Sequence, residues 1–171
     1  MGRIVGGILI LCGCAGLLAC WMGREKSTQK LEADWIRLLL QWEHVLEQEH
    51  LRLYDFFCTC QGLPETKAFL KEVCARMDAH DEPDGKVLWR QAFLHTYKGV
   101  FTGMGEADEI LLSAADAFYG DSREENLHCA KICRKRLEAC LAEARREYAK
   151  KRRVYMPAGM LSGVIMIILL V

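Results

Sequence analysis

The sequence predicts an all-α protein that is held in a membrane at both ends. Hydrophobic residues make up 51% of the 171 residues, and they gather at the two ends of the chain. The charged segment between the ends repeats its apolar residues at steps of three and four, the period of an amphipathic helix. None of it alternates with the period of two that is typical of a strand. We therefore expect a bundle of five or six helices between two terminal transmembrane helices.

The two ends are long enough to cross a bilayer. Residues 4–22 and 154–171 carry no charged side chain. As helices they would each span roughly 27–29 Å, which is close to the thickness of the hydrocarbon core. We expect an N-terminal transmembrane segment in residues 1–23 (span 4–22), a helical domain in residues 24–153, and a C-terminal transmembrane helix in residues 154–171.

The first helix of the domain is expected to continue out of the first span. Its apolar positions recur at helical spacing, at Leu31, Trp35, Leu38, Trp42 and Val45. The opposite, polar face is expected to carry Glu32, Asp34, Arg37, Glu43 and Glu47. The stretch that follows, up to about Phe57, either extends this helix or forms a new one.

Three short helices are expected next. The tripeptide Gly62-Leu63-Pro64 breaks the preceding stretch, because proline cannot continue a helix. The apolar spacing then predicts helices over residues 65–77, from about 87 to 97, and over 107–118. Residues 78–85 are polar and predict a loop between the first two of these helices.

The last soluble helix is expected to be long. The segment SREE, from Ser122 to Glu125, has the pattern of a capping box, in which the serine accepts a hydrogen bond from a backbone N–H at the start of a helix. No breaker follows before Pro157, so this helix can run without interruption into the second span. Its inward stripe is expected at Ala130, Cys133, Leu137, Cys140, Leu141, Ala144 and Tyr148.

The nine cysteines offer a candidate metal site. Cys129 and Cys133 share one face of the last soluble helix, with Cys140 further along it, and thiolates at that spacing could hold zinc in a thiol or metal enzyme. The alternative, which we adopt, is that they are small apolar residues on a buried stripe. Cys58 and Cys60, expected at a helix end, are interpreted in the same way. The odd total argues against a secreted disulfide framework.

Other motifs of catalysis or cofactor binding are absent from the sequence. The histidines are scattered and form no HExxH motif; they are His44, His50, His80, His95 and His128. The glycine-containing segment GVFTGMG lacks the Lys-Ser or Lys-Thr of a phosphate loop. A net charge of zero argues against a nucleic-acid partner. We expect a non-enzymatic protein with no catalytic, cofactor-binding or metal-binding residues.

Basic residues predict the side of the membrane on which the domain lies. Lysines and arginines flank the domain side of both spans, whereas only Arg3 and the amino terminus lie beyond. By the positive-inside rule, the domain of this two-pass protein faces the cytoplasm. An alternative is a cleaved signal. The segment LLAC resembles a lipobox, which would make Cys20 a lipid anchor for an extracytoplasmic binding domain.

Several segments together resemble the stage III sporulation protein AB family of endospore-forming bacteria. GGILILCGC opens like the first span of the family, and LLLQWEHVLEQEHLRLYDFF stands where the family has a leucine-rich helix. FYGDSREENLH resembles its turn into the last soluble helix, and AGMLSGVIMIILLV resembles its closing span. The chain departs from the family pattern at His50-Leu51, which stand in place of a Thr-Pro-Leu turn, and at Asn126, which replaces a glutamine.

The resemblance implies a function. The protein would lie in the mother-cell membrane around the forespore, as part of a transenvelope sporulation channel. Its domain would be similar to the cytoplasmic domains of type II secretion platform proteins. It would act as a platform or adaptor that couples a cytosolic secretion-type ATPase to other membrane subunits of the channel. A homo-oligomer is compatible with that role.

Overall fold

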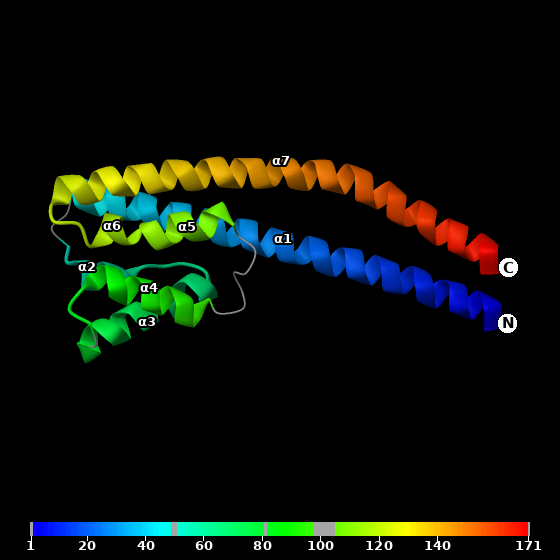
Figure 1. Ribbon diagram of the computed structural model, residues 1–171, viewed down its shortest axis with the longest axis horizontal. Helices are drawn as coiled ribbons and strands as arrows, with labels where there is room; N and C mark the ends of the chain where they lie inside the picture. The colour runs from blue at the N-terminus through cyan, green and yellow to red at the C-terminus, as the bar shows by residue number, and fades with distance from the viewer. Residues whose placement is uncertain (1, 49–50, 81, 98–104, 171) are drawn as a thin grey trace. The chain divides into compact units, whose positions relative to one another are not determined.

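The computed structural model describes residues 2–48, 51–80, 82–97 and 105–170, and for most positions in 2–24 and 155–170 it describes the backbone alone (Figure 1). Every regular element among these residues is a helix, which confirms the all-α prediction. The helices are α1 (Gly2–Gln48), α2 (Leu53–Thr59), α3 (Pro64–Ala79), α4 (Gly85–Thr96), α5 (Glu106–Ser113), α6 (Ala115–Phe118) and α7 (Arg123–Leu170).

The chain divides into two compact units. We call residues 30–141 the helical unit, and residues 1–29 together with 142–171 the end unit. Helices α1 and α7 each contribute residues to both units. The candidate functional site lies in the helical unit.

In the end unit, α1 and α7 are joined by polar contacts. The side-chain amide of Gln29 donates to the carbonyl oxygen of Ala144 over 3.4 Å. The ammonium group of Lys151 lies 3.4 Å from a carboxylate oxygen of Glu25 and 3.5 Å from one of Glu147. These contacts pair the two helices at the end of their charged portions.

In the predicted spans, residues 4–22 and 154–170 have a helical backbone, but most of their side chains lie outside the described residues. Over the part that is described, we find no helix both long enough and apolar enough to cross a membrane. The two membrane spans therefore stay predictions.

The stretch from residue 31 to residue 57 forms two helices. Helix α1 ends at Gln48 and α2 begins at Leu53, which resolves the choice that the sequence left open. Helix α2 ends at Thr59, shortly before the predicted break at Gly62. A Cβ atom on Gly62 would lie 2.8 Å from a carboxylate oxygen of Asp34, so this turn packs against α1 more closely than a larger residue would allow.

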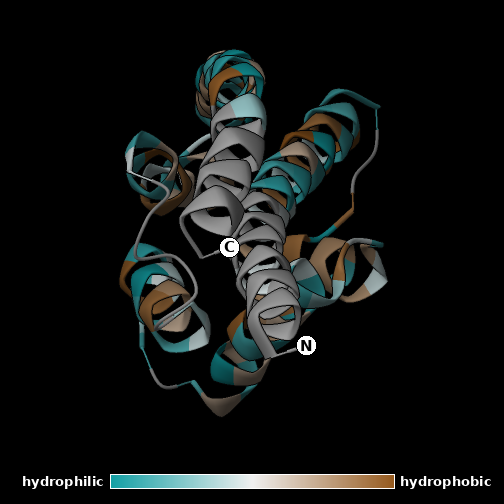
Figure 2. Cartoon of the chain, turned by 90° about the vertical axis from the view of Figure 1, so that its right-hand side faces the viewer, coloured by the Kyte–Doolittle hydropathy of each residue, from teal (hydrophilic) through white to brown (hydrophobic). Residues whose placement is uncertain are grey.

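The core of the helical unit is aromatic. Trp35, Phe69 and Trp89 are fully buried, with ring centroids 5.4 Å apart for Trp35 and Phe69 and 4.7 Å apart for Phe69 and Trp89. Their edge-to-face geometry is favourable for aromatic rings. The stripe predicted on α1 is buried throughout, which confirms the helical period. Figure 2 shows hydrophobic and hydrophilic residues sharing each short helix, as expected for amphipathic helices.

Residues 107–118 do not form the single helix that the sequence predicts. The chain turns at Ala114, between α5 and α6. Short helices expose unpaired carbonyl groups at their ends. Two of these carbonyl groups accept hydrogen bonds from buried indole N–H groups. Trp89 donates to the carbonyl oxygen of Leu111 over 3.0 Å, and Trp42 donates to that of Ala117 over 2.7 Å. Tryptophans from α4 and α1 thus fix the position of the broken helix.

Helix α7 begins as the sequence predicts. The hydroxyl of Ser122 accepts from the backbone N–H of Glu125 over 3.1 Å, which is the serine half of the capping box. The turn before it is closed by Asn126, whose side-chain oxygen accepts from the N–H of Gly120 over 2.8 Å. The helix then continues without a break past Pro157 to Leu170, so the predicted continuity with the second apolar segment is confirmed.

Candidate interaction site in the helical unit

The polar face that we expected opposite the apolar stripe of α1 is partly buried. Only 4% of Glu32, 8% of Asp34 and 7% of Glu43 is exposed, so the prediction of a polar outer face is wrong at these positions. The physical reason is that α1 packs on more than one side. Leu39 and Leu46 are buried with Glu43 between them, at steps of four and three, and they form a second inward stripe. That stripe was the sequence signal for a second buried face.

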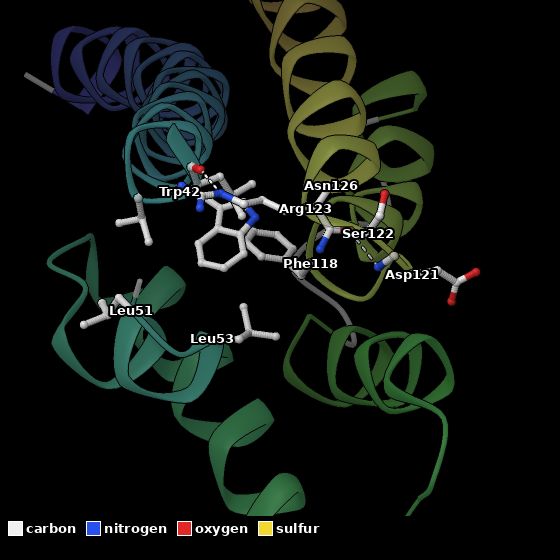
Figure 3. Close-up of a pocket in the computed structure, with 11 residues that line it drawn as sticks. Trp42, Leu51, Leu53, Phe118, Asp121, Ser122, Arg123 and Asn126 are labelled. Carbon is white, nitrogen blue, oxygen red and sulfur yellow. Dashed lines mark hydrogen bonds between the residues drawn. The ribbon is translucent and has the colours of Figure 1, made fainter. Parts of the chain in front are cut away.

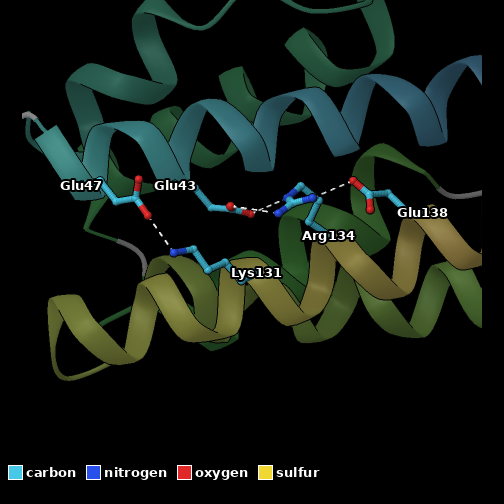
Figure 4. Close-up of polar contacts among 5 residues, drawn as sticks. All are labelled: Glu43, Glu47, Lys131, Arg134 and Glu138. Carbon is cyan, nitrogen blue, oxygen red and sulfur yellow. Dashed lines mark hydrogen bonds and ion pairs between the residues drawn. The ribbon is translucent and has the colours of Figure 1, made fainter.

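Glu43 pairs with Arg134 of α7 in a two-point contact. The Nε and Nη2 atoms of Arg134 lie 2.7 and 3.3 Å from the two carboxylate oxygens of Glu43, as Figure 4 shows. The Nη1 atom of Arg134 reaches Glu138 over 2.7 Å. Hydrogen bonds to Glu43, and then to Glu138, raise the pKa of Arg134 above its ordinary value. Such a bidentate pair fixes both the distance and the rotation of one helix relative to another.

A second pair lies about one turn away, toward the end of α1 and the start of α7. The ammonium group of Lys131 lies 2.7 Å from a carboxylate oxygen of Glu47, and both side chains are nearly half exposed. The hydrogen bond from Lys131 lowers the pKa of Glu47. Because water competes for both groups, removing one partner of this contact costs less stability than removing one partner of the largely shielded Glu43–Arg134 pair.

Asp34 connects α1 to the start of α3. Its carboxylate accepts from the backbone N–H of Leu63 over 2.8 Å and from the guanidinium of Arg37 over 3.1 Å. Leu63 is the residue directly before α3, and its own side chain cannot cap that helix. Asp34 therefore satisfies a backbone donor at the turn that precedes α3.

A pocket of about 410 Å³ opens beside the end of α1. Trp42 and Phe118, with ring centroids 5.5 Å apart, form its apolar wall, and Asp121, Ser122 and Asn126 lie at its polar rim (Figure 3). The guanidinium of Arg123 donates to the carbonyl oxygen of Leu46 and so joins the start of α7 to the end of α1. Among the described residues that line it, the pocket holds no pair of groups suited to acid–base catalysis.

The cysteines of α7 do not converge on a site. Cys133 is buried, whereas Cys129 and Cys140 are half-buried on the same helix. Burial raises the pKa of all three thiols, which opposes the thiolate form that binds zinc. In the parts of the chain that the structure describes, no three side chains of the types that bind metals lie together.

The four histidines that the structure describes lie apart from one another. His44, His95 and His128 are exposed on three different helices, and His80 is exposed at the end of α3, where its φ of 53° is left-handed. His50 lies outside the described residues. The cysteine of α2 makes a contact that the sequence did not predict, because the sulfur atom of Cys58 lies 3.8 Å from that of Cys74 in α3.

Comparison with known proteins gives one match. The family model described as stage III sporulation protein AB matches residues 3–171. Searches of curated proteins and of solved structures found no match. The match covers nearly the whole chain. It agrees with the resemblance to the same family that the sequence segments indicated. The chain therefore belongs to the stage III sporulation protein AB family, and it is a sporulation protein.

Proposed function

We propose that this chain is a non-enzymatic membrane platform of a transenvelope sporulation channel. In this role it couples a cytosolic secretion-type ATPase to membrane subunits between the mother cell and the forespore. The family match over residues 3–171 supports the sporulation part of this proposal. ATP hydrolysis belongs to the partner, and this chain supplies the mechanical connection.

The observation that carries the proposal is the continuity of α1 and α7. Each helix belongs to the helical unit and also to the end unit, without an intervening loop. The backbone hydrogen bonds of a helix lie within the helix, so a displacement at one point is passed along its axis. A partner that moves the helical unit would therefore act directly on the two apolar ends.

The Glu43–Arg134 pair supports the same role. It joins α1 to α7 inside the helical unit through two hydrogen bonds, of 2.7 and 3.3 Å. The pair is largely shielded from water, with side-chain exposures of 9% for Glu43 and 19% for Arg134. A force applied to either helix would be shared by both, because this contact opposes sliding and rotation.

The proposed orientation places the helical unit in the cytoplasm, as the flanking lysines and arginines predict. Cys58 is a suitable reporter, since it is exposed on α2. We expect a membrane-impermeant maleimide to label it only after cells are lysed, and we expect this label to disappear in Cys58→Ser. Labelling of Cys58 in intact cells would contradict the orientation. It would favour the lipid-anchored alternative, with cleavage before Cys20.

Coupling is tested by co-purification of the ATPase. Tagged full-length chain is extracted in detergent from sporulating cells, and we expect the secretion-type ATPase to be retained with it. The ATP hydrolysis rate of the purified ATPase should also change when the full chain is added. If membrane subunits are retained without the ATPase, the coupling role is contradicted, and the chain is a structural scaffold only.

A further inference from the structure

Two helices of the helical unit face each other through a pair of thiols. The sulfur atoms of Cys58 in α2 and Cys74 in α3 are 3.8 Å apart. One turn away on each helix, the hydroxyl of Tyr54 donates to a carboxylate oxygen of Asp78 over 3.1 Å. Tyr54 precedes Cys58 by four residues, and Asp78 follows Cys74 by four. The two contacts therefore run in opposite order along the helices, so α2 and α3 are antiparallel here and their register holds the thiols together.

The two thiols differ in access to solvent. Cys58 is exposed, whereas only 8% of Cys74 is exposed. Burial, and then the hydrogen bond with Cys58, raise the pKa of Cys74 to about 12, so Cys74 stays a thiol near neutral pH. A small solute can therefore reach the sulfur of Cys58 directly, and the buried sulfur of Cys74 is in contact with it. This is the arrangement of an attacked cysteine and a resolving cysteine.

The neighbouring cysteine on the same helix end has a different environment. The sulfur atom of Cys60 lies 3.5 Å from the side-chain oxygen of Gln41 in α1. It is half-buried and stands just after the last residue of α2. Cys58 and Cys60 are separated by only one residue. The sulfur atom of Cys58 contacts a second thiol, whereas that of Cys60 contacts an amide oxygen.

We propose that Cys58 and Cys74 form a reversible disulfide when the protein meets a peroxide. A disulfide requires the sulfur atoms to approach to about 2.05 Å, compared with 3.8 Å between the thiols. Cys58 lies in the last turn of α2, where side-chain rotation and fraying of the helix end can supply this movement. The bond would tie α2 to α3 around the turn at Gly62.

The chemistry balances with hydrogen peroxide as the oxidant. The Cys58 thiolate attacks one peroxide oxygen, the O–O bond breaks, and the departing hydroxide takes up the proton that Cys58 released, which gives water and a sulfenic acid. The sulfur of Cys74 then attacks the sulfur of Cys58, and hydroxide leaves with the proton of Cys74 as a second water. The two thiols lose two electrons in total, and these reduce the peroxide. A dithiol reductant reverses the change.

The linkage can be read directly by peptide mapping of the full-length chain in detergent. Reduced protein is treated with hydrogen peroxide, free thiols are blocked with N-ethylmaleimide, and the chain is digested with trypsin without reductant. Cleavage places Cys58 and Cys60 together in peptide 53–67 and Cys74 in peptide 72–76. We expect these two peptides to be joined, with the mass of two hydrogens lost, and to separate on treatment with dithiothreitol.

Two matched variants identify the sulfur atom involved. We expect the joined peptides to disappear in Cys58→Ser and to persist in Cys60→Ser. Circular dichroism of both variants checks that they are folded, which we expect because neither side chain is fully buried. A mixture of ¹⁵N-labelled and unlabelled chains distinguishes a bond within one chain from a bond between two. No joined peptides in the folded wild type, a joined product that survives in Cys58→Ser, or a product of mixed isotope content would each overturn the proposal.

Discussion

At the scale of single residues, the most consequential contact is the ion pair between Glu43 and Arg134. Both side chains are mostly shielded from solvent, and the two residues are 91 positions apart in the sequence. Forming such a pair requires both charges to leave water, so its net contribution to stability is small. Losing only one partner is costly, because the other charge is then buried alone.

We predict that Arg134→Met lowers the free energy of unfolding by about 3 kcal/mol, because Glu43 is then left buried without its partner. The measurement is urea unfolding of the full chain in detergent, followed by tryptophan fluorescence. Lys131→Met is the matched control on the same helix, and it should shift the midpoint little, because its pair with Glu47 is half exposed. The double variant Glu43→Gln/Arg134→Met should recover part of the loss. Equal effects of Arg134→Met and Lys131→Met would contradict the assignment.

At the scale of helices and turns, the connection from α2 to α3 depends on a side chain of α1. Asp34 accepts the N–H of Leu63, and Gly62 passes directly over the same carboxylate. Helix α3 begins with Pro64, which lacks an N–H and suits a first helical position. The start of α3 is thus set partly by its own proline and partly by a contact from α1.

We predict that Asp34→Ala destabilises the helical unit by about 1–3 kcal/mol, because the partly buried N–H of Leu63 loses its acceptor. Asp34→Asn keeps an oxygen at that position and should cost clearly less. Hydrogen exchange of the first turn of α3, measured by mass spectrometry, should rise in Asp34→Ala more than exchange in α4. If the two variants were equally destabilised, the negative charge of Asp34 would be its main contribution and the hydrogen bond to Leu63 a minor one.

The sequence predicted helices well and contacts between helices poorly. The apolar stripe of α1, the break at Gly62 and the serine cap of α7 are local patterns, and each appears as predicted. Leu39 and Leu46 on α1 signal the buried face that carries Glu43, but its partner Arg134 lies 91 positions away, so the spacing of α1 alone could not identify the pair. The turn at Ala114 depends on indole N–H groups from α1 and α4. The Cys58–Cys74 contact depends on the register of two helices, which local periodicity leaves undetermined.

At the scale of the whole molecule, the stripe of α7 holds the helical unit together. Leu137 is fully buried on this helix, whereas 44% of Ile132 is exposed. A charged substitution at each of these two positions therefore shows whether a loss of stability comes from the buried face of α7 or from an added charge anywhere on this helix. The proposed coupling role requires the helical unit to be folded, so both stability and partner retention should follow the buried face.

We predict that Leu137→Asp unfolds the helical unit, because it buries an unpaired carboxylate and removes core contacts, at a combined cost above about 4 kcal/mol. Ile132→Asp should leave the fold unchanged. Near-ultraviolet circular dichroism reports the packing of the buried tryptophans, and limited proteolysis reports the opening of the unit. ATPase retention should be lost in Leu137→Asp. A folded Leu137→Asp protein would show that the inward face of α7 is wrongly assigned.

The contacts of the end unit also constrain the order in which the protein can assemble. Gln29 meets Ala144 across 115 positions of sequence, and Lys151 meets Glu25 across 126. The helical unit is complete at residue 141, before any residue of the second half of the end unit has been synthesised. During translation, the first segment of α1 must therefore wait for its partner while residues 30–141 fold. Closure of the end unit therefore requires synthesis to have passed Ala144 and Lys151, after the whole of the helical unit.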